Sequence, residues 1–247
     1  MIYSGLSGLQ LKLRQTDFPE EHRESSRLTY YSTIFNSIEI NSCFYKVPKP
    51  KTVEKWTLSV HDDFKFTFKL WKEITHQKEL FFKEEDIIHF MQTISGAGNK
   101  KGSLLIQLPP STEFSAFPQL ERIIAIITRW DPDHGWDIAV EFRNRTWYRE
   151  EVYEMLSHYQ CDVVVQDIPR SATPMIVHRA SFVYVRFHGP KGDYRDSYAD
   201  SFLAEYAAYI KEWSEEGKKV YVYFNNTAGD AYNNLESMNK MLWPFRH

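Results

Sequence analysis

Short apolar runs that end in polar or charged side chains recur along the whole sequence. Seven such runs are present, and each is followed by a loop and then by a stretch with helical spacing. Strands that alternate with helices form parallel sheets, and the carboxyl ends of these strands meet at one edge. The pattern therefore predicts an α/β protein whose functional groups gather at that edge. The runs cover residues 37–41, 64–69, 104–107, 138–143, 162–167, 183–188 and 220–225.

The number of strand–helix units points to one α/β fold. About eight units are present, which matches a single (β/α)8 TIM barrel over residues 1–247. The sixth unit is weak, because Pro174 interrupts residues 169–180 and leaves room for a loop or barely one helical turn. A first strand is expected at 2–5, and helices are expected at 26–35, 51–60, 84–95, 120–127, 150–158, 199–213 and 232–242.

Alternation within the strands predicts which side chains share the interior of the barrel. Arg186 and His188 have one parity, and the branched apolar residues of the same run have the other. A barrel strand turns one face to the outer helices and the other to the interior. The sixth strand is ambiguous, because Asp167 and Gln166 have opposite parity. The residues expected at the barrel mouth are Glu39, Asn41, Lys69, Gln107, Glu141, Arg143, Arg186, His188 and Asn225.

Composition excludes some classes of protein. The 30 basic and 33 acidic residues give a formal net charge of -3, so no global basic field attracts nucleic acid or an anionic membrane. A local basic patch is still compatible with this net charge. Cys43 and Cys161 lack metal-type spacing and are interpreted as buried hydrophobes of a reducing compartment. Neither a signal peptide nor an apolar run near the roughly 20 residues of a membrane helix is present, so a soluble cytoplasmic protein is expected. The oligomeric state is left open.

Seven segments, taken in order, carry the motifs of one family. They are 39–45 (E-I-N-S-C-F-Y), 74–76 (I-T-H), 107–110 (Q-L-P-P), 141–147 (E-F-R with Trp147), 167–170, 184–189 (Y-V-R-F-H-G) and 223–226 (Y-F-N-N). Together they resemble the DUF72 family, also called YecE-like. The resemblance implies a TIM barrel without an assigned activity, and it gives His76 most of its functional weight. Tyr45 and Trp147 could stack on a sugar ring or base or belong to the core, and Asn226 could bind substrate through its amide or cap the last helix. The sequence departs from the family at Gly5-Leu6-Ser7-Gly8-Leu9, where G-T-S-G-W is usual, and this puts a first-strand contribution to the site in doubt.

Acidic side chains near strand ends are the candidates for catalysis. Glu39, Glu141 and Asp167 are of the type that serves as general bases or metal ligands, and His188 could assist proton transfer. Glu39 and Glu141 are the preferred acid–base pair. The alternative for each carboxylate is an ion pair with a neighbouring cation. Burying several charges together is costly without a function, and this favours a functional site over simple ion pairs.

A divalent metal is an open alternative. Glu141, Asp167 and His188 lie on consecutive predicted strands, in an order similar to the metal sites of xylose-isomerase-like and endonuclease-IV-like barrels. The eighth strand offers Asn225 or Asn226 instead of a carboxylate, which favours a polar pocket without metal. No phosphate-binding loop or dinucleotide fingerprint is present, so no nucleotide cofactor is expected.

Basic side chains at the same end suit an anionic ligand. Lys69, Arg143, Arg186 and Arg170 could bind phosphate or carboxylate, or could balance the nearby carboxylates. A strand lysine can also form a Schiff base, but nothing near Lys69 in the sequence indicates the lowered pKa that this needs. The expected substrate-binding residues are Asn41, Tyr45, Lys69, His76, Gln107, Arg143, Trp147, Arg186, Asn225 and Asn226.

Three functions fit these residues. The first is an enzyme (an isomerase, lyase or hydrolase) that acts by acid–base chemistry on a small polar, anionic or sugar-like substrate. The second is a nucleic-acid-processing or nucleic-acid-binding barrel similar in plan to endonuclease IV, disfavoured by the net charge. The third is a non-catalytic ligand-binding module, and fold alone does not separate the three.

Overall fold

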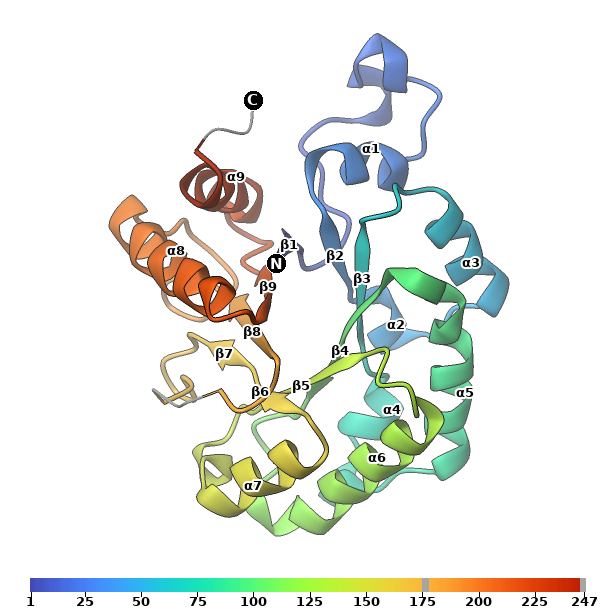
Figure 1. Cartoon of the computed structure of the whole chain (residues 1–247), viewed down its shortest axis with the longest axis vertical. Coiled ribbons are helices and arrows are strands. Elements are labelled where there is room, and N and C mark those ends of the chain that lie inside the picture. Colours follow the sequence, from blue (N-terminus) through green and yellow to red (C-terminus); the bar gives the residue numbers. More distant parts are fainter. Residues whose placement is uncertain (175–177, 245–247) are drawn as a thin grey trace.

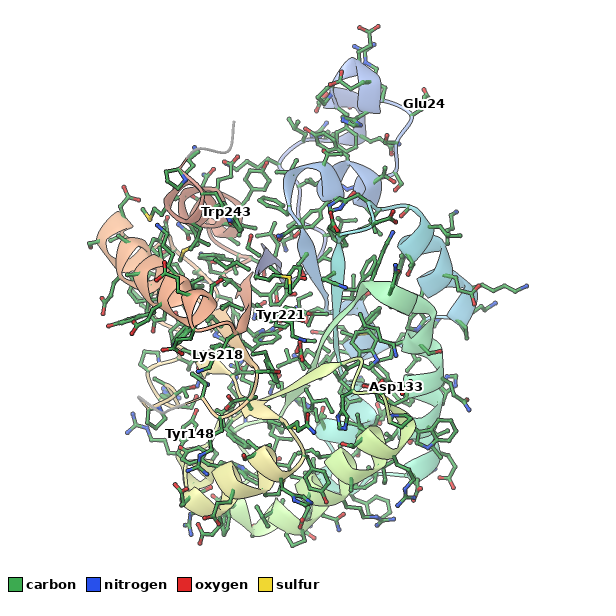
Figure 2. The ribbon with its side chains drawn as sticks, viewed as in Figure 1. Glu24, Asp133, Tyr148, Lys218, Tyr221 and Trp243 are labelled. Carbon is green, nitrogen blue, oxygen red and sulfur yellow. The ribbon has the colours of Figure 1, made fainter. Side chains whose placement is uncertain are left out.

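A computed structural model of the chain describes residues 1–174 and 178–244. Residues 175–177, which fall in the weak sixth unit, and 245–247 lie outside the described residues. Strands gather toward the middle of the molecule and helices lie around them (Figure 1). The segment between the first strand and the first helix extends away from this body and has Glu24 near its tip (Figure 2).

The strands form two sheets in which every pairing is parallel. One sheet has the order β1-β9-β8-β7, and the other has the order β2-β3-β4-β5-β6. Between the sheets, β6 and β7 are separated only by Val164, and an isolated parallel bridge links Ser7 to Glu39. The strands are β1 (Ile2–Leu6), β2 (Ser37–Ile40), β3 (Lys65–Lys69), β4 (Lys101–Gln107), β5 (Asp137–Glu141), β6 (Asp162–Val163), β7 (Val165–Gln166), β8 (Phe182–Phe187) and β9 (Lys219–Phe224).

Most helices occupy the predicted places, and local chemistry explains where they begin. The Ser26 hydroxyl accepts a hydrogen bond from the Thr29 N–H at the start of α1. Pro50 opens α3, where its missing N–H is tolerated. Within 168–174 and 178–181 the structure has no helix, in line with the weak sixth unit. The helices are α1 (Arg27–Ile34), α2 (Ser42–Tyr45), α3 (Pro50–Leu58), α4 (Lys72–Thr75), α5 (Glu84–Ile94), α6 (Phe117–Trp130), α7 (Glu150–His158), α8 (Asp200–Glu215) and α9 (Ala231–Leu242).

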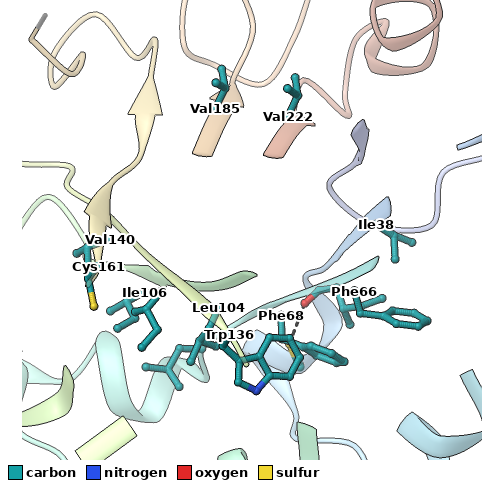
Figure 3. Close-up of a cluster of buried hydrophobic side chains, with 14 of the residues drawn as sticks. Ile38, Phe66, Phe68, Leu104, Ile106, Trp136, Val140, Cys161, Val185 and Val222 are labelled. Atoms are coloured by element: carbon teal, nitrogen blue, oxygen red, sulfur yellow. Dashed lines mark hydrogen bonds between the residues drawn. The ribbon is translucent and has the colours of Figure 1, made fainter. Parts of the chain in front are cut away.

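Two hydrophobic clusters lie on opposite faces of the strands. The larger cluster joins the strands to the surrounding helices, and its side chains point outward from the strands (Figure 3). The smaller cluster fills the other face and contains Leu105, Ala139, Val164, Tyr184 and Tyr223. Adjacent residues of one strand fall in different clusters, as the period of two requires.

Polar contacts on this inner face join the two sheets. The Tyr223 hydroxyl lies 2.5 Å from the Ser37 hydroxyl and 2.7 Å from the Thr67 hydroxyl, so β9 reaches across to β2 and β3. Below this level the Tyr221 hydroxyl donates to an Asp137 carboxylate oxygen at 2.8 Å, and Figure 2 places Tyr221 in the middle of the molecule. The space under the carboxyl ends of the strands is therefore filled and cross-linked.

Across the part of the chain that the structure describes, no helix is both long enough and apolar enough to cross a membrane.

Candidate functional site

Arg186, on the inner face of β8, is the centre of a buried cluster of charges. Its Nη2 donates to Glu39 Oε1 at 2.8 Å, and its Nε donates to Glu39 Oε2 at 2.9 Å. Its Nη1 donates to Glu141 Oε2 at 3.0 Å. Both carboxylates are fully buried, and Arg186 is 1% exposed. The fixed fork of the guanidinium thus joins the ends of β2, β5 and β8.

Glu39 has both oxygens fully engaged. Besides Arg186, the hydroxyls of Ser7 and Tyr184 donate to it. Burial alone would raise the pKa of Glu39, but the charge and hydrogen bonds of Arg186 outweigh burial and lower it. An ionised carboxylate that is saturated with donors is a poor proton acceptor. These contacts favour a structural role for Glu39, which holds Arg186 in place, over the predicted acid–base role.

Glu141, at the end of β5, lies between two arginines. Arg143 Nε donates to its Oε1, and Arg186 donates to its Oε2. Burial would raise the pKa of Glu141, yet the charges of Arg143 and Arg186 hold it well below its ordinary range. The contacts favour a role for Glu141 as the anchor of two guanidinium groups over the predicted acid–base role.

His188 is fully buried, and its partners define its tautomer. Nδ1 lies 3.2 Å from Asp167 Oδ1, which can only accept, so Nδ1 carries the proton. Nε2 lies 3.0 Å from both Arg143 Nη2 and Arg186 Nη1, which can only donate, so Nε2 presents its lone pair. Burial lowers the pKa of His188 and outweighs the neighbouring carboxylates Glu141 and Asp167, which raise it. The imidazole is therefore neutral.

Asp167 follows β7 and orients this imidazole. Its Oδ1 also accepts the His188 backbone N–H at 2.9 Å. Its Oδ2 accepts the hydroxyl of Tyr198, which in turn accepts the Gly189 N–H at 2.6 Å. The chain from Tyr198 through Asp167 to His188 resembles the arrangement in which a carboxylate fixes a histidine for proton transfer.

Lys69, at the end of β3, is the cation of this group that lacks an acidic partner. Among residues 1–174 and 178–244, no hydrogen bond or ion pair to its Nζ is found, and the nitrogen lies 4.0 Å from the centroid of the Phe44 ring. Burial lowers the pKa of Lys69 to about 8, with help from the charge of Arg186 against the opposing effect of Glu141. Three N–H donors are thus available for a ligand.

His76 lies beside the same phenyl ring. Its ring centroid is 4.8 Å from that of Phe44, and its Nδ1 is 2.8 Å from the Thr75 hydroxyl. Burial lowers the pKa of His76 to about 4, aided by the charges of Lys69 and Arg143. His76 is therefore a second neutral imidazole close to Lys69.

Two buried atoms near the ends of β2 and β3 have no partner within the described chain. They are Oδ1 of Asn41 and Nε1 of Trp71. The other amide atom of Asn41, Nδ2, donates to the Ser7 hydroxyl at 3.1 Å, which places Asn41 beside the Glu39–Arg186 pair. An unsatisfied acceptor and an unsatisfied donor are features that a bound polar ligand would complete.

Several predicted binding residues have other roles. Trp147 is fully buried, stacks on Phe142 at 5.0 Å and donates its indole N–H to the Thr112 carbonyl, so its predicted ligand contact is corrected to a core role. Gln107 donates to the Leu108 carbonyl at 2.8 Å. Tyr45 is 69% exposed on α2, outside the charged cluster.

The paired asparagines after β9 differ from each other. Asn225 is buried, and its backbone N–H donates to the Phe187 carbonyl at 2.7 Å. Asn226 Nδ2 donates to the Asp196 carbonyl at 3.0 Å and to Asn234 Oδ1 at 2.9 Å. Asn226 thus anchors the loop that follows β8 instead of pointing to the cluster, although its own Oδ1 has no partner among the described residues.

The three candidate metal ligands, Glu141, Asp167 and His188, are not assembled into a metal site within the described residues. No group of three or more His, Cys, Asp or Glu side chains in the described part of the chain could hold a metal ion. The reason is the arginines, which occupy both oxygens of Glu141 and face Nε2 of His188. The analogy with endonuclease IV rested on these ligands and loses its main support.

A cavity of about 1080 Å³ lies at the opposite, amino-terminal ends of the strands. Ile2, Asn36 and Lys65 line it, and one of its acidic residues, Asp62, has a 98% exposed side chain. The predicted site residues lie at the other ends of the strands, so the candidate site is the buried cluster at the carboxyl ends.

Comparison with known proteins agrees with the motifs found in the sequence. A family model described as "Protein of unknown function DUF72" matches residues 3–245. The chain belongs to the DUF72 family. The UPF0759 protein YunF of Bacillus subtilis (strain 168) is 29% identical over 277 residues, which cover 98% of this chain and 95% of YunF. The UPF0759 protein YecE of Escherichia coli (strain K12) is 34% identical over 82 residues, which cover 33% of this chain and 30% of YecE.

Solved structures of DUF72 proteins share the fold. One from Enterococcus faecalis V583 superposes with a TM-score of 0.80 at 23% identity, covering 100% of this chain and 97% of that chain. One from Thermotoga maritima MSB8 superposes with a TM-score of 0.78 at 25% identity, covering 98% of this chain and 99% of that chain. None of these relatives carries an activity in its name.

Sequence reasoning missed four residues of this DUF72 cluster. Tyr184 could have been found, because it shares the parity of Arg186 on the same strand. Ser7 directly follows the first strand, whose contribution to the site was in doubt, yet it donates to Glu39. Tyr198 and Tyr194 come from the loop after β8, where no periodicity marks them; the Tyr194 hydroxyl accepts from Arg143 Nη1 at 3.1 Å.

Proposed function

We propose that this DUF72 protein binds a small anionic substrate at the carboxyl ends of its strands and acts on it by acid–base chemistry. The proposal rests on a difference between the acidic and the basic side chains of the cluster. Every carboxylate oxygen of Glu39, Glu141 and Asp167 already has a donor, whereas Lys69 has no acceptor among the described residues. A phosphate or carboxylate would supply the missing acceptor.

Arg143 is the second group suited to the anion. Its Nε is held by Glu141, while its Nη1 and Nη2 contact Tyr194 and His188. These last two contacts are with neutral groups, so a substrate anion would be the stronger acceptor. Drawing Arg143 toward the substrate would also remove one of the two guanidinium donors that face His188 Nε2, while Arg186 Nη1 would stay beside that atom. Substrate binding would thus make the lone pair of His188 more accessible to a substrate proton.

His188 is the preferred base of the proposed reaction. Its Nδ1–H is held by Asp167, its Nε2 carries the lone pair, and it is neutral. When His188 takes a proton, Asp167 and Glu141 stabilise the imidazolium, with Glu141 Oε1 3.5 Å from Nε2. Glu141 thus contributes as a charge and not as the base.

We infer that the two sheets form one (β/α)8 barrel. The inference is supported by the continuity of β6 and β7, by the bridge between Ser7 and Glu39, and by the close approach of β1 to β2. A Cβ added at Gly5 would lie 2.0 Å from the Ser37 carbonyl oxygen, so only glycine fits there. In a barrel the cluster would occupy the mouth where TIM-barrel enzymes act.

Thermal shift with non-reactive anions tests the proposal. Phosphate and glycerol 3-phosphate should raise the melting temperature of the wild type more than glycerol at the same ionic strength. Lys69→Met should abolish this increase, because the unpartnered cation is gone. Lys55→Met, on the exposed surface of α3, is the matched control and should respond like the wild type.

Two results would oppose the proposal. If neither anion stabilises the wild type beyond the effect of salt, no anion site of useful affinity exists. If Lys69→Met responds as strongly as Lys55→Met, the anion binds elsewhere. Once an activity is found, His188→Gln should reduce kcat far more than it weakens anion binding.

A further inference from the structure

The environment of the Lys69 nitrogen differs from that of an ordinary anion-binding lysine. The strong salt bridges of the cluster belong to the arginines, and the Lys69 amine lies against the Phe44 ring, without an acceptor within the described chain. An ammonium group in such a place loses hydration and gains no carboxylate partner, which favours the neutral amine. A neutral amine with a free lone pair is a nucleophile.

The neighbouring charges determine the reactivity of Lys69 and the class of substrate that can bind beside it. Arg186 is held by Glu39 and Glu141 and cannot move away, so its charge opposes protonation of Lys69. Together with burial it brings the pKa of Lys69 to about 8, which leaves a usable fraction of free amine near neutral pH. Arg143 provides a separate place for an anionic group.

We propose that Lys69 forms an imine with the carbonyl carbon of a small aldehyde or ketone that also carries a carboxylate or phosphate. This inference rests on the proposed function and names its substrate class. When the substrate first binds, Lys69 is either protonated or neutral. Arg143 would hold the anionic group of the substrate while the neutral Lys69 amine reacts with the carbonyl carbon.

The chemistry needs no oxidant or reductant. The amine lone pair of Lys69 forms a bond to the carbonyl carbon, the carbonyl π electrons move to oxygen, and a proton moves from nitrogen to oxygen to give a carbinolamine. The C–O bond then breaks, its oxygen takes a second proton and leaves as water, and the nitrogen lone pair forms the C=N bond. Hydrolysis reverses these steps and restores the lysine.

His76 is placed to move the protons. It packs against the same phenyl ring as Lys69, and its pKa of about 4 keeps it neutral, so one ring nitrogen can donate and the other can accept. Its Nδ1 is occupied by the Thr75 hydroxyl, which leaves Nε2 for the carbinolamine oxygen. His188 would remain available for a proton on the carbon next to the imine.

Reductive trapping tests the inference. The wild type is incubated at pH 7.5 with glyoxylate, pyruvate or glycolaldehyde phosphate, each with sodium cyanoborohydride, and intact mass and peptide mapping locate the secondary amine. At least one compound should give a single adduct at Lys69 at a level at least tenfold above that at exposed Lys55. Lys69→Met should lose the adduct, and Lys55→Met should keep it.

Lys69→Arg separates the two proposals, because it retains a cation but cannot form an imine. It should keep at least part of the stabilisation by phosphate and lose the adduct. If the wild type is stabilised by phosphate but Lys69 is labelled no more than Lys55 by all three compounds, the imine is refuted and anion binding stands. If phosphate has no effect and Lys69 is nevertheless trapped, the imine stands and the general anion site is refuted.

Discussion

Replacing Lys69 with methionine should stabilise this protein at pH 7. Methionine fills a similar volume, can pack its thioether against the Phe44 ring and removes a charge that the folded state disfavours. The pKa of Lys69 falls from its ordinary 10.5 to about 8 on folding. At about 1.4 kcal/mol per pKa unit, the charged side chain costs roughly 3 kcal/mol of folding free energy at pH 7. Losing the cation–π contact with Phe44 offsets about 0.5–1 kcal/mol of this gain.

The sign of the pH dependence follows from the proton count. Between pH 8 and 10.5 the unfolded chain still binds the Lys69 proton while the folded chain has released it, so wild-type stability gains with rising pH from this group. Below pH 8 the whole cost is present, and above 10.5 it is absent. The advantage of Lys69→Met should therefore be greatest at pH 7 and should shrink through this window.

Urea denaturation of wild type, Lys69→Met and Lys55→Met at pH 7, 8.5 and 10 measures this difference. Other groups that titrate in this range are common to the three proteins and cancel in the comparison. Lys55→Met should track the wild type within about 0.5 kcal/mol, as exposed substitutions usually do. The reasoning is refuted if Lys69→Met is no more stable than the wild type at pH 7, or if its advantage does not change with pH.

Three further predictions concern the rest of the cluster. Arg186→Met should cost about 3–5 kcal/mol of unfolding free energy in urea, because it leaves Glu39 buried without its cation. Arg179→Met, which removes an exposed ion pair with Glu150, should change stability far less; equal effects would contradict the buried network. Nitrogen-15 NMR should show His188 as the neutral Nδ1–H tautomer at pH 6.5, since its pKa is lowered, and an imidazolium signal would exclude this assignment. Tyr198→Phe should lower the free energy of unfolding in urea by about 1–3 kcal/mol, because it removes a buried hydrogen-bond donor. An unchanged urea midpoint would show that the Tyr198 hydroxyl does not stabilise the fold.

Alternation predicted the faces of the strands but not the partners of the side chains. Arg186 and His188 share a parity, and both lie in the cluster with Glu39 and Glu141. Parity sets the direction of a side chain along a strand, whereas the pairing of particular carboxylates and guanidinium groups depends on rotamers and on distances between strands. The sequence therefore could not show that both glutamates are occupied by arginine side chains.

Other parts of the site lay outside any periodic pattern. Asp167 follows a strand that is interrupted at Val164, so its parity was ambiguous. Tyr198 comes from a loop, where spacing carries no information about burial. The lowered pKa of Lys69 arises from burial and from charges contributed by other strands, so no local sequence signal could reveal it.

The pairing of β1 with β9 has a consequence for biosynthesis. Ile2 pairs with Val220, and Leu6 pairs with Phe224, so the first strand made finds its ladder partner only after the last strand has been made. At about 5–20 residues per second, the ribosome needs roughly 10–40 s to travel between them. During that interval β1 lacks its ladder partner β9, and until Arg186 is made Ser7 can approach only a Glu39 that has not yet paired with Arg186. The nascent chain should therefore acquire its charged cluster only at the end of translation.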